Sequence, residues 1–150
     1  MKENKIEAII DVGGKPSIRR MAVATGIILL QEKTILAIKN NEISKGNVIE
    51  ASTVAVIQAV KDTPRIIPHC HIVPIEGCNV DWSFEGTNLR CTVEVSANYR
   101  TGVEMEALVG VSAGLLCVFD MVKSFEKDDS GQYPEATIND IKVLSKKKLI

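Results

Sequence analysis

Two charged residues beside an otherwise apolar stretch are the first candidates for chemistry. Asp120 follows the apolar run that ends at Phe119, and Lys123 lies one helical turn further along the chain. Because an unpaired buried carboxylate costs several kcal/mol, we expect Asp120 to be buried and paired with Lys123. Such a pair keeps a base and a proton donor side by side, as general acid–base catalysis requires. A structural ion pair near a helix end would show the same spacing.

Two glutamates near the start of the same predicted helix have different explanations. Glu104 can be the last residue of a capping box that begins at Thr101, whereas Glu106 has no such local role. Glu106 and Asp120 are fourteen positions apart, which is about 21 Å along a straight helix. They cannot bind one small substrate within one helix. Either they serve different sites, or a second subunit brings the two helix ends together.

Two further segments contain groups that could bind an anion or transfer a proton. Lys45 and Gly46 precede a predicted helix N-terminus, where free N–H groups attract phosphate, although a solvated lysine in a turn is the more ordinary explanation. His69-Cys70-His71 offers zinc-type ligands, but adjacent ligands without paired Cys-x-x-Cys spacing make a poor zinc template, so we expect no metal. His71 could be a general acid or base, a phosphate ligand, or simply a packed loop histidine.

Apolar periodicity predicts the elements that position these residues. Strands are expected over residues 20–30, 80–84, 89–95 and 138–144, a short helix over 31–39, and two longer helices starting at Asn47 and Thr101. Asn47 is the expected N-cap of its helix, and Pro64 is expected to end it. This order predicts an α+β, ferredoxin-like βαββαβ fold, an antiparallel sheet with two long helices on one face plus the short extra helix. Since the fold hosts many functions, it does not decide the chemistry.

Chain length and net charge limit the number of domains and the kinds of partner that we expect. At 150 residues the chain fits one domain, with residues 1–20 as a flexible N-terminal arm and residues 21–150 as a single catalytic domain. The net charge of -1 provides no broad field for nucleic acid or an anionic membrane. The N-terminus does not resemble a signal peptide, and the longest apolar run, residues 107–119, is shorter than the ~20 residues that span a bilayer. We therefore expect a cytoplasmic protein with reduced cysteines and with neither nucleic acid nor membrane as a partner.

Four motifs, taken together, resemble one enzyme family. They are Lys45-Gly46-Asn47-Val48, Ile67-Pro68-His69-Cys70-His71, Thr101-Gly102-Val103-Glu104-Met105-Glu106-Ala107-Leu108 and Asp120-Met121-Val122-Lys123. In this order they look like the cyclic pyranopterin monophosphate synthase family, also called the molybdenum cofactor biosynthesis protein C family. The third motif followed by the fourth is the most specific part. The resemblance extends from Asp11 to Lys146, nearly the whole chain.

The resemblance implies a lyase that needs no cofactor. Its substrate would be cyclised dihydro-GTP, 3',8-cyclo-7,8-dihydroguanosine 5'-triphosphate, converted to cyclic pyranopterin monophosphate with release of pyrophosphate. It also implies hexamers, trimers of dimers with sites between subunits, which would bring the two ends of the long helix together. By resemblance the catalytic residues are Asp120, Lys123, Lys45 and His71, and the substrate-binding residues are Cys70, Glu104, Met105, Glu106, Lys15, Arg20, Lys61 and Lys146.

Several positions depart from the family pattern. Asn47 replaces the family's usual Asp, Ile18 its Thr, His69 its Leu and Ile72 its Pro, and Lys146-Lys147-Lys148 replaces a Lys-x-Gly-Gly-Lys tail. The three lysines could contact phosphate directly or form a solvated basic end. Two other functions fit the sequence. One is a non-catalytic ferredoxin-like module that binds a nucleotide or pterin unchanged, and the other is a metal-binding protein that uses the His69-Cys70-His71 segment.

Overall fold

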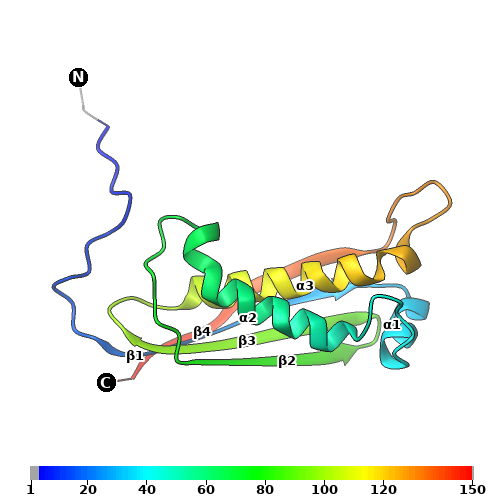
Figure 1. Ribbon diagram of the computed structural model, residues 1–150, viewed down its shortest axis with the longest axis horizontal. Coiled ribbons are helices and arrows are strands. Elements are labelled where there is room, and N and C mark those ends of the chain that lie inside the picture. Colours follow the sequence, from blue (N-terminus) through cyan, green and yellow to red (C-terminus); the bar gives the residue numbers. More distant parts are fainter. Residues whose placement is uncertain (1–3, 150) are drawn as a thin grey trace.

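The computed structural model describes residues 4–149, which form an antiparallel sheet with helices on one face (Figure 1). Residues 4–17 form neither helix nor strand. The elements then follow in the order β1 (Ile18–Leu29), α1 (Glu32–Lys39), α2 (Val48–Ile66), β2 (Gly77–Glu85), β3 (Asn88–Tyr99), α3 (Glu104–Glu126) and β4 (Thr137–Leu149). The strand order is β2-β3-β1-β4, and every neighbouring pair is antiparallel. This is the split βαβ arrangement of a ferredoxin-like fold, as predicted.

The core lies between one face of the sheet and helices α2 and α3. Alternate residues of β1 and β3 point to this face and are almost completely buried, as the period of two in a strand requires. These residues are Ala22, Ala24, Ile28, Leu89, Cys91, Val93 and Val95. All four cysteines are free, and burial raises the pKa of Cys91 to about 12, so this thiol stays protonated at neutral pH.

Two glycines let α2 and α3 pack closely together. A Cβ atom at Gly110 would lie 2.8 Å from Val60 Cγ2, and one at Gly114 would lie 2.6 Å from Val56 Cγ2. Both distances are shorter than a carbon–carbon contact, so a larger residue would push the helices apart. Within residues 4–149, α3 is also the one helix long and apolar enough to cross a bilayer, and half of its most apolar window is buried in this domain.

The end of α2 differs from the prediction, which was wrong in placing it at Pro64. Pro64 lies inside α2, and the helix continues to Ile66. The proline removes one backbone donor, so one intrahelical hydrogen bond is lost. The N–H of Ile67 still donates to the carbonyl oxygen of Thr63 at 2.8 Å, and this bond closes the last turn around the proline.

The start of α3 also differs, because the predicted capping box from Thr101 to Glu104 does not form. The N-cap residue is Val103, which makes no side-chain cap, and Glu104 is the first helical residue. The Glu104 carboxylate instead accepts a hydrogen bond from Lys146 Nζ at 3.2 Å. A cation on β4, distant in the sequence, thus competes successfully with the local cap.

The last strand is longer than predicted and includes Lys146 to Lys148. In the pairing of β4 with β1, Lys146 lies opposite Ala22 and Lys148 lies opposite Arg20. Paired residues point to the same face of a sheet, so Lys146 and Lys148 share the helix-covered face with Arg20. Pairing with the central strand therefore overrides the low strand propensity of three consecutive lysines.

Candidate functional site

A cluster of three charged residues lies near the C-terminal end of α3. Asp120 Oδ1 is 2.9 Å from Lys123 Nζ, and Asp120 Oδ2 accepts a hydrogen bond from Lys45 Nζ, also at 2.9 Å. Lys45 comes from the loop between α1 and α2 and donates a second bond to the Asp120 carbonyl oxygen at 3.1 Å. The predicted pairing of Asp120 with Lys123 is therefore present, and the Lys45 loop joins it.

The expectation that Asp120 is buried was wrong for this chain. The Asp120 side chain is 57% exposed, and those of Lys45 and Lys123 are 48% and 45% exposed. Asp120 lies one turn beyond Leu116, which is itself 60% exposed, so both occupy the face of α3 that no element of this chain covers. An apolar run in the sequence identifies the helix but not which of its faces the same chain covers.

The ionisation of this cluster is fixed by its ion pairs. Hydrogen bonds from Lys45 and then Lys123 hold the pKa of the Asp120 carboxyl below its usual range. The hydrogen bond with Asp120 in turn raises the pKa of Lys123. At neutral pH the cluster is therefore one carboxylate between two ammonium groups, with net positive charge available to an anion.

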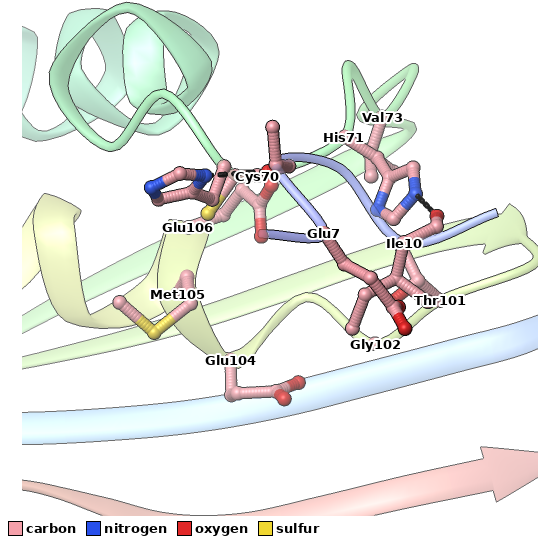
Figure 2. A pocket seen from close by; sticks show the side chains of 12 residues that line it. Glu7, Ile10, Cys70, His71, Val73, Thr101, Gly102, Glu104, Met105 and Glu106 are labelled. Atoms are coloured by element: carbon pink, nitrogen blue, oxygen red, sulfur yellow. Dashed lines mark hydrogen bonds between the residues drawn. The ribbon is translucent and has the colours of Figure 1, made fainter. Parts of the chain in front are cut away.

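A pocket of about 240 Å³ lies at the opposite end of α3, beside its N-terminus (Figure 2). Three segments line it: arm residues 7–10, the loop that contains His71, and residues 101–106. Figure 2 shows Ile10 beside His71 on one side of the pocket and Cys70 beside Glu106 on the other. The pocket brings together five residues of the predicted site, namely Cys70, His71, Glu104, Met105 and Glu106.

Burial raises the pKa of two acidic groups in this pocket, the Glu106 carboxyl and the Cys70 thiol. Glu106 is only 3% exposed, and desolvation raises the pKa of its carboxyl. The charge of Glu104 raises this pKa further, while a hydrogen bond from the backbone N–H of Glu106 and the nearby His71 lower it. Burial, assisted by the charges of Glu106 and Glu104, also raises the pKa of Cys70, which keeps the thiol protonated at neutral pH. Glu106 is thus a carboxyl group that binds a proton more readily than an exposed glutamate.

Gly102 makes room for the ion pair at the edge of the pocket. A Cβ atom at Gly102 would lie 2.9 Å from Lys146 Cε, so a side chain there would displace Lys146 from Glu104. Glu104 Oε2 is buried and has no hydrogen-bond partner among residues 4–149. This oxygen can accept one further donor, from a ligand or from another subunit.

The remaining predicted contacts lie outside this pocket. Arg20 is 7% exposed, and its guanidinium donates to the Arg100 carbonyl oxygen at 3.4 Å, while its Nε has no partner among the described residues. Lys15 is exposed in a turn of the N-terminal arm, and Lys61 is exposed on α2. Their places in a site stay predictions.

Glu126, which no sequence pattern predicts as a buried residue, holds α1 against the end of α3. Its side chain is 1% exposed, and Oε2 accepts hydrogen bonds from the Gln31 N–H at 3.0 Å and from the Thr34 hydroxyl. These bonds satisfy donors at the start of α1 and tie α1, and with it the loop that carries Lys45, to α3. A glutamate followed by Lys127 and two aspartates is typical of a solvated helix end, so no pattern marks it as buried.

Metal coordination has no geometric support in the part of the chain that the structure describes. Within residues 4–149, no group of three or more His, Cys, Asp or Glu side chains could hold a metal ion. His69 and His71 each form a hydrogen bond to a backbone carbonyl oxygen of the arm.

Comparison with known proteins gives a consistent result. A family model described as the MoaC family matches residues 9–148. A probable cyclic pyranopterin monophosphate synthase of Methanospirillum hungatei is 49% identical over 140 residues, which cover 93% of this chain and 90% of the relative. A relative in Methanothermobacter thermautotrophicus, named as a probable cyclic pyranopterin monophosphate synthase accessory protein, is 50% identical over 94% of this chain and 89% of its own length. A probable cyclic pyranopterin monophosphate synthase of Thermococcus kodakarensis is 49% identical over 93% of this chain and 90% of its own.

Proposed function

The chain belongs to the MoaC family, and we propose that it is a cyclic pyranopterin monophosphate synthase, a lyase of molybdenum cofactor biosynthesis. Its substrate is cyclised dihydro-GTP, and its products are cyclic pyranopterin monophosphate and pyrophosphate. The observation that carries this proposal is the Lys45–Asp120–Lys123 cluster, which is built from two of the motifs that resemble the family. Relatives named as probable cyclic pyranopterin monophosphate synthases are 45–49% identical over nearly the whole chain.

The charge cluster suits the step that releases pyrophosphate. A cyclic phosphate forms when a hydroxyl of the substrate attacks the α-phosphorus and the bond to pyrophosphate breaks. The attacking oxygen must lose a proton, and negative charge develops on the leaving group. Lys45 and Lys123 supply two positive charges for that anion, and Asp120 orients both ammonium groups. Asp120 is also an ionised carboxylate that can accept the hydroxyl proton.

The pocket suits the proton transfers of the ring rearrangement. Burial raises the pKa of the Glu106 carboxyl, so this group keeps a proton to higher pH than an exposed carboxyl and is suited to proton transfer. His71 is a second proton carrier in the same pocket. Lys146, held by Glu104, adds a cation at the pocket edge.

We infer that a complete site needs two subunits. The pocket and the charge cluster lie at opposite ends of α3, so within one chain they form two separate halves about 21 Å apart. Between the two ends, α2 and α3 expose an apolar groove of about 360 Å³, lined by residues that include Ile66, Leu108 and Leu116. Exposed apolar surface of this kind supports subunit contact, and the hexamer built as a trimer of dimers would join one chain's pocket to its partner's cluster.

Mixed oligomers test whether the site is shared. Asp120→Asn and His71→Ala chains, each inactive alone, would be co-expressed with different affinity tags and purified through both. If one chain supplies Asp120 and its partner supplies His71, random mixing makes roughly one quarter of the sites intact and restores turnover. Mixed oligomers as inactive as each parent would contradict the shared site.

We also propose that the protein works in the cytoplasm without a membrane or nucleic acid as partner. The substrate is a water-soluble triphosphate, and the net charge of -1 gives no broad positive surface for a polyanion.

The proposed activity is tested by incubating the purified chain with cyclised dihydro-GTP and measuring pyrophosphate. An enzyme releases pyrophosphate in proportion to time and enzyme concentration. A non-catalytic nucleotide or pterin-binding module would bind the compound and return it unchanged, and that result would overturn the proposal.

A further inference from the structure

The N-terminal arm touches the pocket through two histidines. The backbone carbonyl oxygen of Ala8 lies 2.5 Å from His69 Nδ1. The backbone carbonyl oxygen of Ile10 lies 2.6 Å from His71 Nε2 (Figure 2). A carbonyl oxygen can only accept a hydrogen bond, so both of these ring nitrogens must carry a hydrogen. The two histidines alternate with Cys70 along one loop, and they hold alternate residues of the arm.

These two bonds are the main attachment of the arm. In the described part of the chain, the other hydrogen bonds within residues 4–17 are local, from Gly13 N–H to Asp11 and from Lys15 N–H to Val12. The apolar side chains of residues 6–10 add little, because Ile6, Ile9 and Ile10 are 79%, 59% and 59% exposed, whereas Val12, closer to β1, is buried. Without the histidine bonds, little would hold residues 7–10 against the pocket.

The arm forms a wall of the pocket and does not fill it. Glu7, Ala8 and Ile10 line the cavity of about 240 Å³ together with Cys70 and Glu106, so the cavity persists with the arm in place. A plug would leave no such space. Residues 7–10 therefore share the walls of this pocket with the buried Glu106 side chain.

We propose that His69 is a positioning residue, whose Nδ1–H fastens residues 7–10 as one wall of the active-site pocket. The assignment of this pocket as a substrate site rests on the proposed function. The bond from His71 to Ile10 has a second consequence, because Nε2 carries the hydrogen and Nδ1 keeps the lone pair. While the arm is fastened, His71 accepts a proton through Nδ1 alone.

Paired substitutions of His69 separate the hydrogen bond from the bulk of the side chain. His69→Leu removes the donor, and leucine is the usual residue at this position in the family that the sequence resembles, so the loop should accept it. His69→Asn keeps a donor, because the side-chain nitrogen of asparagine occupies about the position of histidine Nδ1. The comparison of the two variants is therefore a test of the donor itself.

Amide hydrogen exchange measures the fastening directly, without reference to activity. In His69→Leu, exchange of the hydrogen-bonded Gly13 and Lys15 amides of the arm should accelerate by about 3- to 10-fold, the effect of one hydrogen bond, and His69→Asn should restore the slow rate. Nitrogen NMR of His71 should report a protonated Nε2 and an unprotonated Nδ1 in the unaltered protein, and this preference should weaken in His69→Leu. Equal exchange in all three proteins, or a His71 with Nδ1 protonated, would overturn the proposal.

Steady-state kinetics test whether the wall formed by residues 7–10 contributes to substrate binding. The KM for cyclised dihydro-GTP should rise by about 3- to 10-fold in His69→Leu, a larger factor than any fall in kcat, and should return in His69→Asn. An unchanged KM in His69→Leu would contradict a role in substrate binding. If the unaltered protein releases no pyrophosphate, the proposed function fails, whereas the exchange experiment still decides whether His69 fastens the arm.

Discussion

The two ends of α3 control their charged side chains in opposite ways. At the N-terminal end Glu106 is buried, and the loss of hydration raises the pKa of its carboxyl. At the C-terminal end Asp120 is exposed, and two lysines lower the pKa of its carboxyl. Burial makes the first group ready to exchange a proton, whereas ion pairing keeps the second group charged. One helix therefore offers a proton carrier at one end and an anion-binding cluster at the other.

The largest expected effect comes from breaking the exposed cluster. Asp120→Asn and Lys123→Ala should each lower kcat by about 10²- to 10⁴-fold, as expected for loss of a general acid–base group or of a charge that stabilises the transition state. Thermal unfolding of the chain should change little, because the cluster is exposed within one chain and contributes little to its packing.

Asp129→Asn is the matched control, since Asp129 is an exposed aspartate in the loop after α3 and should keep full turnover. Near-normal rates for both Asp120→Asn and Lys123→Ala would make the ion pair merely structural. The charged cluster at the C-terminal end of α3 would then have no role in catalysis.

A smaller effect is expected from a substitution in the middle of α3, where this helix packs closely against α2. Gly114→Ala places a methyl group 2.6 Å from Val56 Cγ2 and 3.3 Å from Trp82. We expect the free energy of unfolding, measured in urea, to fall by about 1–3 kcal/mol through overpacking, more than alanine gains as a helix former. Gly14→Ala is the control, because a Cβ atom there meets nothing within 4 Å. Equal stabilities of the two variants would show that α2 and α3 adjust their spacing freely.

The smallest effect is a change in the pH dependence of stability. Unfolded Glu106 titrates near 4.5, and the folded carboxyl has a raised pKa. Between these two values the folded state keeps a proton that the unfolded state has released, so the free energy of unfolding falls as pH rises. Glu106→Gln should remove this fall and gain stability relative to the unaltered protein at neutral pH.

Denaturant titrations from acid to neutral pH measure this effect. Glu135→Gln, a change at an exposed glutamate, should reproduce the pH dependence of the unaltered protein. Parallel curves for Glu106→Gln and the unaltered protein would show that burial does not raise the Glu106 pKa.

Much of the fold could be predicted because its signals are local. The period of two in β1 and β3 and the N-cap at Asn47 each depend on neighbouring residues, and the Asn47 side chain does accept the Glu50 N–H at 3.0 Å. The predictions that were wrong depend either on how a helical turn closes or on groups distant in the sequence. Pro64 is tolerated because the following turn closes, and Glu104 leaves its cap because β4 presents Lys146.

The candidate site was less predictable for the same reason. The ion pair between Asp120 and Lys123 follows from their spacing, but its exposure depends on which face of α3 the chain covers. The attachment of the arm depends on carbonyl oxygens of Ala8 and Ile10, which every residue type has, so no sequence pattern reveals it. From the sequence, His69 is a possible metal ligand and a departure from the family's usual leucine, and neither observation predicts its bond to the arm.

The unbroken length of α3 limits which insertions and deletions the chain can accept. Each residue of a helix advances it by about 1.5 Å and turns it by about 100°. One residue added between Gly110 and Gly114 would rotate Asp120 to a different side of the molecule while leaving Glu106 in place. Changes of length should therefore accumulate in residues 127–136, which join α3 to β4 without regular structure, and be absent from the helix itself.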